Sequence, residues 1–154
     1  ALGGALGGYV AGPRAVVDLL RQRARPYLFS NALPPAVVAA GLAALDIVEA
    51  GDDLRADLGR NAATWRAGLT AAGFDLLPGA HPIIPVMLHD ARRAQAMASR
   101  LFDLGVYVSG FFFPVVPQGR ARIRTQMNAR LTAGDLEAAL GAFAQAGRET
   151  GVLA

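Results

Sequence analysis

Residues 105–127, "GVYVSGFFFPVVPQGRARIRTQM", contain two strand-like runs that are separated by prolines and a glycine. The first run, "GVYVSGFFFP" (105–114), is rich in valine and aromatic residues, which favour strands. In the second, "ARIRTQM" (121–127), apolar and polar side chains alternate, as they do in a strand with one buried face. We therefore predict two strands here, both in a sheet with one apolar face.

The flanking segments extend this pattern in both directions. Two further runs are strand-like, "FDLLPG" (74–79) and "IIPVML" (83–88). Residues 91–104 have helical periodicity, and Thr132 with Asp135 resembles a capping box that starts a final helix. The order after Gly73 is then β, β, α, β, β, α, which predicts a small α+β layer with helices covering one sheet.

The sequence pattern of the amino-terminal third predicts fewer helices and strands than that of the rest of the chain. We expect a short buried strand at 8–12, a helix from Pro13 to the basic residues 21–25, an extended connection at 26–35 and another helix that ends at Gly51. One strand and two helices cannot bury a sheet face by themselves. Residues 1–50 are therefore predicted to belong to a larger sheet.

Composition excludes several classes of protein. The chain has 154 residues, 53% of them hydrophobic, which suits one globular domain of ordinary size. It has no cysteine for disulfides or metal binding, and we expect no metal. Its apolar runs are too short to cross a membrane and its first residues do not resemble a secretory signal, so we expect a cytoplasmic location.

The charge pattern argues against nucleic-acid binding and against lysine chemistry. All 15 basic residues are arginines, they are scattered among 12 carboxylates, and the net charge is only +3. Nucleic-acid binding usually requires a clustered basic surface. Because lysine is absent, these residues by themselves provide neither a Walker-type phosphate loop nor an amine for a Schiff base.

Two groups of residues are candidates for binding anions. Ser30 and Asn31 in "YLFSN" form either a solvated turn, with Asn31 bonded to its own backbone, or a phosphate site built from a hydroxyl and an amide. Arg120, Arg122 and Arg124 alternate along residues 120–124, so a strand would direct all three to one face. That face is either a solvent-exposed surface with salt bridges or a place where one guanidinium binds a carboxylate.

Other motifs point to structure more than to chemistry. The paired glycines of "ALGGALGG" lack the dinucleotide-binding spacing and predict a tight turn. His81 and His89 have no third ligand at metal-site spacing, and no hydrolase motif is present. The run "FFFP" (111–114) is expected in a core or an interface.

Four segments together closely resemble the carboxy-terminal part of the glycine C-acetyltransferases: "ALGGALGGYVAG", "RQRARPYLFSNALPPAVVAA", "IIPVML" and "GVYVSGFFFPVVPQGRARIRTQMNA". These enzymes belong to the α-oxoamine synthase group of fold-type I pyridoxal-phosphate (PLP) transferases. The resemblance implies an α/β fold, in which residues 1–50 end the large PLP-binding domain. Residues 51–154 would form a connecting helix and a small α+β domain.

The resemblance also implies roles for individual residues. The Schiff-base lysine would stand directly before Ala1, so this chain contains no catalytic residue and is expected to be inactive alone. Ser30 and Asn31 would bind the cofactor phosphate of the partner subunit in a homodimer, and Arg124 would bind the substrate carboxylate. Leu131 stands where relatives commonly have a histidine, so any contribution of that histidine is missing here.

The implied reaction is the condensation of glycine with acetyl-CoA to 2-amino-3-oxobutanoate and CoA, or its reversal in threonine breakdown. Neither nucleic acid nor a membrane is expected as a partner. Two alternatives stay open at this point. The intact protein could be another α-oxoamine synthase, for 5-aminolevulinate or 8-amino-7-oxononanoate, or the chain could be a non-catalytic binding or dimerisation module.

Overall fold

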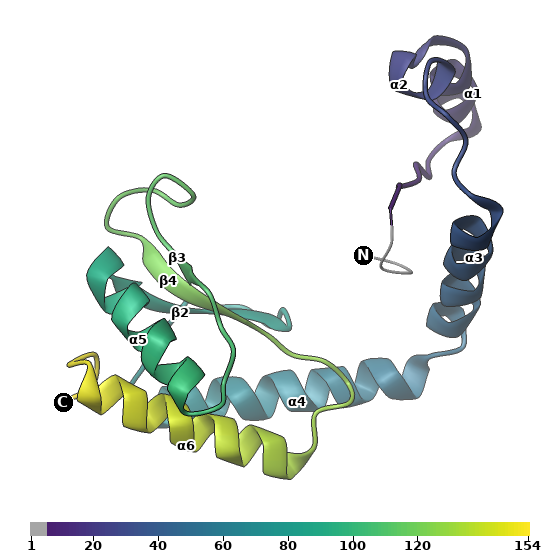
Figure 1. The fold of residues 1–154 in the computed structure, drawn as a ribbon. Coiled ribbons are helices and arrows are strands. Elements are labelled where there is room, and N and C mark those ends of the chain that lie inside the picture. The colour runs from purple at the N-terminus through teal and green to yellow at the C-terminus, as the bar shows by residue number, and fades with distance from the viewer. Residues whose placement is uncertain (1–5) are drawn as a thin grey trace. The chain divides into compact units, whose positions relative to one another are not determined.

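The computed structural model describes residues 6–154, which divide into two compact units, Ala1–Asp52 and Asp53–Ala154 (Figure 1). Ala1 and the glycine pair Gly3–Gly4 therefore lie outside the described residues. Each unit is described by itself.

The second unit has the predicted order of elements. It contains these helices and strands: α4 (Asp52–Ala71), β1 (Asp75–Leu76), β2 (Ile83–His89), α5 (Ala91–Asp103), β3 (Gly110–Phe111), β4 (Ala121–Gln126) and α6 (Ala133–Glu149). The strands form one antiparallel sheet in the order β1-β2-β4-β3. From β1 onward the sequence of elements is β, β, α, β, β, α, so this prediction is confirmed.

Helix residues and one face of the sheet form the core of this unit. Alternate residues of β4 are buried, as period-two packing requires. They meet apolar side chains of α4, α5 and α6, which Figure 1 shows running beside the sheet. Phe143 of α6 lies at the centre, with its ring 5.2 Å from that of Trp65 and 6.0 Å from that of Phe74, both edge to face. Such pairs stabilise a core beyond the area they bury.

Two helices of the second unit begin with side-chain caps. At the start of α6, Thr132 and Asp135 form the predicted capping box, in which the Asp135 N–H donates to the Thr132 hydroxyl and the Thr132 N–H donates to the Asp135 carboxylate. At the start of α5, the Asp90 carboxylate accepts a hydrogen bond from the Arg93 N–H at 3.0 Å. Both caps satisfy backbone groups that a helix end leaves free.

The strand prediction for residues 105–114 was too long. Only Gly110–Phe111 pairs with β4, at Ile123 and Arg122. After Phe111 the chain turns, because Pro114 has no N–H for a ladder and the N–H of Val115 donates to the Phe112 carbonyl at 2.9 Å. Residues 74–79 likewise form only the two-residue strand β1.

Over residues 6–52 the first unit contains three helices, α1 (Arg14–Arg23), α2 (Arg25–Leu28) and α3 (Pro35–Glu49). Two predictions for this region were wrong. Residues 8–12 form no strand, and they pair with none of the strands among the described residues. The segment 26–35 is not extended throughout, since a proline suits the first turn of a helix and Pro26 stands in the first turn of α2.

Glycine permits one close approach in this unit. Gly7 has a φ of 93°, and a Cβ there would lie 2.7 Å from the methyl groups of Leu33. The backbone conformation and the limited space both favour glycine at this position.

None of the helices in the described part of the chain is both long and apolar enough to cross a membrane.

Candidate functional site

Strand β4 separates the apolar core from an arginine-bearing face. Ala121, Ile123 and Thr125 are buried, whereas Arg122 and Arg124 are not. The alternation predicted for this strand is confirmed. Arg120 lies just before the strand begins.

Arg124 differs from its neighbours in its contacts. Its guanidinium carbon lies 4.7 Å from the centre of the Phe111 ring. Among the described residues it makes no hydrogen bond or ion pair, whereas the Nε–H of Arg122 donates to the Arg120 carbonyl at 3.0 Å. The salt bridges that would make this an ordinary charged surface are therefore absent at Arg124 within residues 6–154, and its N–H donors are available to an anion.

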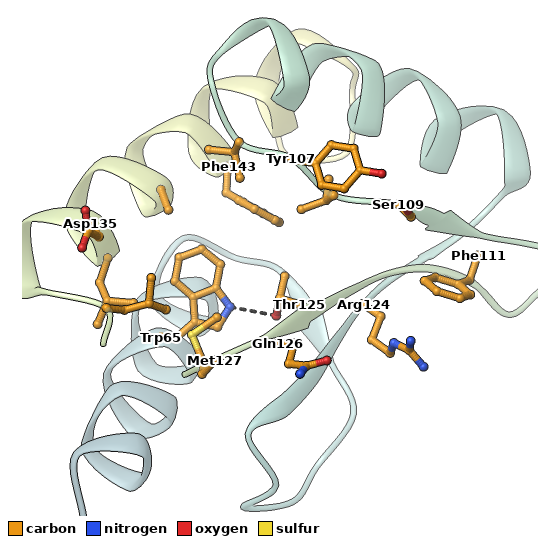
Figure 2. Close-up of a pocket in the computed structure, with 15 residues that line it drawn as sticks. Trp65, Tyr107, Ser109, Phe111, Arg124, Thr125, Gln126, Met127, Asp135 and Phe143 are labelled. Atoms are coloured by element: carbon orange, nitrogen blue, oxygen red, sulfur yellow. Dashed lines mark hydrogen bonds between the residues drawn. The ribbon is translucent and has the colours of Figure 1, made fainter. Parts of the chain in front are cut away.

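Arg124 lies at the edge of a hollow of about 500 Å³, which we call the Arg124 hollow (Figure 2). Polar residues in its lining are Tyr107, Ser109, Arg124, Thr125, Gln126 and Asp135. Apolar residues in its lining include Trp65, Val106, Val108, Leu131 and Phe143. The hollow thus combines one guanidinium, one carboxylate and several neutral hydrogen-bonding groups with an apolar base. Apolar pockets with a few polar groups are typical of small-molecule sites.

The base of the Arg124 hollow is held by a buried chain of hydrogen bonds. The Trp65 Nε1–H donates to the Thr125 hydroxyl at 2.9 Å, the dashed line in Figure 2. That hydroxyl in turn donates to the Ile84 carbonyl at 2.8 Å. The chain ties α4 to β4 and β2, so the strand that carries Arg124 is fixed from its core side.

Leu131 contributes an apolar side chain to this hollow. The side chain is half-buried against the core, and the Leu131 carbonyl accepts a hydrogen bond from the Asn61 Nδ2 at 2.9 Å. A histidine at this position would bring a titratable ring to the hollow. The histidine that the resemblance leads us to expect here would therefore change the polarity of the hollow, whereas the loop is held by a backbone carbonyl.

Asp135 lines the hollow and caps α6 at the same time. Hydrogen bonds from the Thr132 backbone and then from its hydroxyl lower the pKa of Asp135. The carboxylate is therefore ionised at neutral pH, and its Oδ2 accepts hydrogen bonds from the Thr132 N–H and hydroxyl. This commitment makes it a structural group more than a free base.

Ser30 and Asn31 follow α2 in the first unit, and both are exposed. Neither side chain makes a hydrogen bond to any described residue, so the turn in which Asn31 bonds to its own backbone is not found. The hydroxyl and the amide are both available to a ligand. Ser30 and Asn31 belong to the first unit and Arg124 to the second.

The two histidines have local partners. The Nε2 of His89 lies 2.8 Å from an Asp75 carboxylate oxygen, and the Nδ1 of His81 accepts from the Ile83 N–H at 3.0 Å. Within residues 6–154, no group of three or more His, Cys, Asp or Glu side chains is arranged to hold a metal ion.

The phenylalanine run is not part of the core. Phe112 and Phe113 are 37% and 59% exposed, so of the two predicted environments the core is wrong and the interface stays a prediction. Sequence reasoning also missed the contact of Phe111 with Arg124. The sequence of three consecutive phenylalanines does not indicate that Phe111 differs from Phe112 and Phe113. Only the pairing of Phe111 with Arg122 between β3 and β4 distinguishes it.

Comparison with known proteins agrees with this architecture. The family model for aminotransferase class I and II matches residues 2–143. The chain belongs to the class I and II aminotransferase family. Within that family it is 54% identical, over all 154 residues, to 2-amino-3-ketobutyrate coenzyme A ligase of Escherichia coli K12. It is 45% identical over 150 residues to 8-amino-7-oxononanoate synthase of Symbiobacterium thermophilum.

A solved class I and II relative has the same fold. Serine palmitoyltransferase of S. paucimobilis, with PLP and myriocin bound, superposes with a TM-score of 0.84 at 34% identity, covering 88% of this chain and 35% of that one. The fold-type I assignment made from the sequence is therefore confirmed. The chain spans 39% of the length of the E. coli relative and 38% of the Symbiobacterium one.

Proposed function

We propose that the intact protein condenses glycine with acetyl-CoA to give 2-amino-3-oxobutanoate and CoA, or catalyses the reverse cleavage. In the forward direction glycine loses an α-proton, its α-carbon bonds to the acetyl carbonyl carbon, and the thioester C–S bond breaks to release CoA as a thiol. The observation that carries the proposal is the uncommitted guanidinium of Arg124 beside a small hollow. The 54% identity to the E. coli ligase supports the choice of substrates.

The residues fit the phosphate of PLP, the group bound in the solved relative. Ser30 and Asn31 offer a hydroxyl and an amide that no described residue occupies, and both can donate to phosphate oxygens. When bound, PLP withdraws electrons from the α-carbon of an attached amino acid. No lysine occurs among the 154 residues, so these residues supply no amine that could anchor the cofactor. The chain alone is expected to be inactive.

Arg124 would orient the amino acid. A guanidinium binds a carboxylate through two parallel N–H donors, which fixes both the position and the plane of the substrate. With the carboxylate held, the direction of the α C–H bond is restricted, and such positioning lowers the barrier to proton removal.

Replacement of Arg124 by alanine in the full-length enzyme tests this role. Loss of one bidentate charged contact costs about 2–4 kcal/mol. The glycine KM should therefore rise about 30-fold or more, while PLP stays bound. Arg122→Ala is the matched control, because it removes a guanidinium from the same strand face that already donates to a carbonyl. An unchanged glycine KM in the Arg124 variant would exclude the carboxylate role.

The phosphate role of Ser30 and Asn31 has a separate test. The double variant Ser30→Ala with Asn31→Ala should lose PLP during gel filtration, which absorbance and phosphate analysis would measure. We further propose that these residues reach the cofactor of the partner subunit in a homodimer, and light scattering would detect that dimer. Normal PLP content in the double variant would contradict the phosphate assignment.

A second acyl donor is the main alternative, because the chain is also 45% identical to an 8-amino-7-oxononanoate synthase. Assays of the full-length protein with acetyl-, succinyl- and pimeloyl donors would distinguish the candidates, and we expect acetyl-CoA to be preferred. Turnover with none of them would favour a non-catalytic dimerisation module. The cytoplasmic location remains a prediction, which cell fractionation would test.

A further inference from the structure

We propose that Phe111 is a positioning residue that holds the Arg124 guanidinium in place for a carboxylate. The inference rests on the role proposed above for Arg124. Its basis is a single contact of defined geometry, in which the guanidinium carbon lies 4.7 Å from the centre of the Phe111 ring. Figure 2 shows the two side chains next to each other at one end of the Arg124 hollow.

An aromatic ring can hold an arginine without using its hydrogen-bond donors. The ring attracts the cation through the negative charge of its π face, whereas a carboxylate or carbonyl partner would occupy N–H groups. Two other arginines of this unit have N–H groups that are occupied by oxygen acceptors. Arg100 donates to the Glu149 carboxylate, and Arg122 donates to the Arg120 carbonyl. Among the described residues Arg124 has neither kind of partner, so Phe111 restrains the side chain and leaves its donors free.

The strand register places the ring where this contact forms. Phe111 pairs with Arg122 across β3 and β4, and Arg124 lies two residues further along the same face. Diagonal neighbours at this spacing are within reach of aromatic and long side chains. Phe112 is the next residue along the chain and therefore does not share this register position.

A close contact of β3 with helix α5 restricts the position of Phe111. A Cβ at Gly110 would lie 3.2 Å from the carbonyl oxygen of Ala94, which is backbone and cannot rotate away. The absence of a side chain at Gly110 thus allows β3 to lie directly against α5. Phe111 follows Gly110 in this strand. The packing against α5 therefore restricts the backbone from which the Phe111 ring projects.

The test compares full-length Phe111→Leu and Phe111→Tyr. Loss of a partly exposed cation–π contact should raise the glycine KM, and the glycine Kd from calorimetry, about three- to tenfold in the leucine variant. The tyrosine variant retains the ring and should stay within about twofold of wild type. The acetyl-CoA KM and the PLP content should not change in either variant.

Two controls separate this role from a general loss of structure. Phe102→Leu removes an exposed ring that meets Tyr107 edge to face without touching Arg124, and it should leave glycine binding unchanged. In an Arg124→Ala background, Phe111→Leu should cause no further rise in the glycine KM, because the contact is already lost.

Three results would overturn the inference. Wild-type glycine binding in Phe111→Leu, while Arg124→Ala binds weakly, would refute the positioning role and keep the proposed function. Equal losses of glycine binding in Phe111→Leu and Phe111→Tyr would show that binding depends on the shape of the phenylalanine side chain and not on an aromatic ring face. Wild-type binding in Arg124→Ala would instead refute the carboxylate role itself.

Discussion

The two units of this chain differ in what stabilises their helices. In the second unit α4, α5 and α6 bury apolar side chains against a sheet, and the buried hydrophobic residues extend from Ala62 to Ala146. In the first unit, none of the hydrophobic side chains of residues 6–52 is buried. Helix α3 shows the contrast most clearly, because its sequence is apolar on nearly every side and none of its residues is buried.

This difference shows that local signals suffice to form a helix but not to stabilise a unit. Proline at the first turn starts both α2 and α3 in the first unit. Most helical stability in proteins nevertheless comes from packing of an apolar face. A helix that is apolar all round is normally buried, so α3 has the composition of a helix that needs a larger structure around it.

The strongest test of the comparison is to separate the units. Residues 53–154 expressed alone should unfold cooperatively on heating, because they contain all the hydrophobic side chains that are buried within residues 6–154. Residues 1–52 alone should show weak helical signal without a sharp transition. Circular dichroism melts of both segments would measure this, and similar cooperative transitions in the two would contradict the comparison.

Paired truncations test the same contrast residue by residue. Phe143→Ala should cost about 3–5 kcal/mol of unfolding free energy in the 154-residue chain, because it removes a fully buried ring from between two aromatic neighbours. Leu42→Ala should change it by about 0.5 kcal/mol or less, since Leu42 is 59% exposed. Denaturant titration gives both values, and a large effect at Leu42 would reveal packing in the first unit.

A smaller effect is expected at the cap of α6. Thr132→Ala removes the hydroxyl that accepts from the Asp135 N–H, and should cost about 1 kcal/mol. Thr132→Ser keeps the hydroxyl and is the matched control. If thermal denaturation shows equal losses in both variants, the cap does not contribute through this hydrogen bond.

The smallest effect is expected from the ion pair that joins α5 to α6. Hydrogen bonding to Arg100, and then to Gln145, lowers the pKa of Glu149. A lowered pKa stabilises the fold above the unfolded-state pKa of this carboxyl, and the stabilisation is lost as the pH falls through the folded-state value. Glu149→Gln should therefore lower the Tm slightly at neutral pH, and this difference should shrink as the pH falls below the ordinary pKa of glutamate. A Tm difference that persists in acid would contradict this assignment.

Much of the second unit could be predicted because its sequence signals are local and agree with one another. The alternation in 121–127 predicted both the buried face of β4 and the arginine face, and Thr132 with Asp135 predicted the start of α6. Arg124 was singled out by the resemblance alone, since alternation treats Arg120, Arg122 and Arg124 alike. The prediction failed where pairing partners decide the outcome, at 8–12 and in most of 105–114.

The amino-acid sequence by itself determined the order of the elements from β1 onward, the capping box of α6 and the family, because periodicity, capping residues and shared motifs are properties of neighbouring positions. Only the tertiary structure decided which of the three arginines contacts an aromatic ring and which phenylalanine supplies that ring. Those facts depend on the register between β3 and β4, in which Phe111 lies opposite Arg122 and diagonal to Arg124. A register joins residues that are distant along the chain, so no local pattern specifies it.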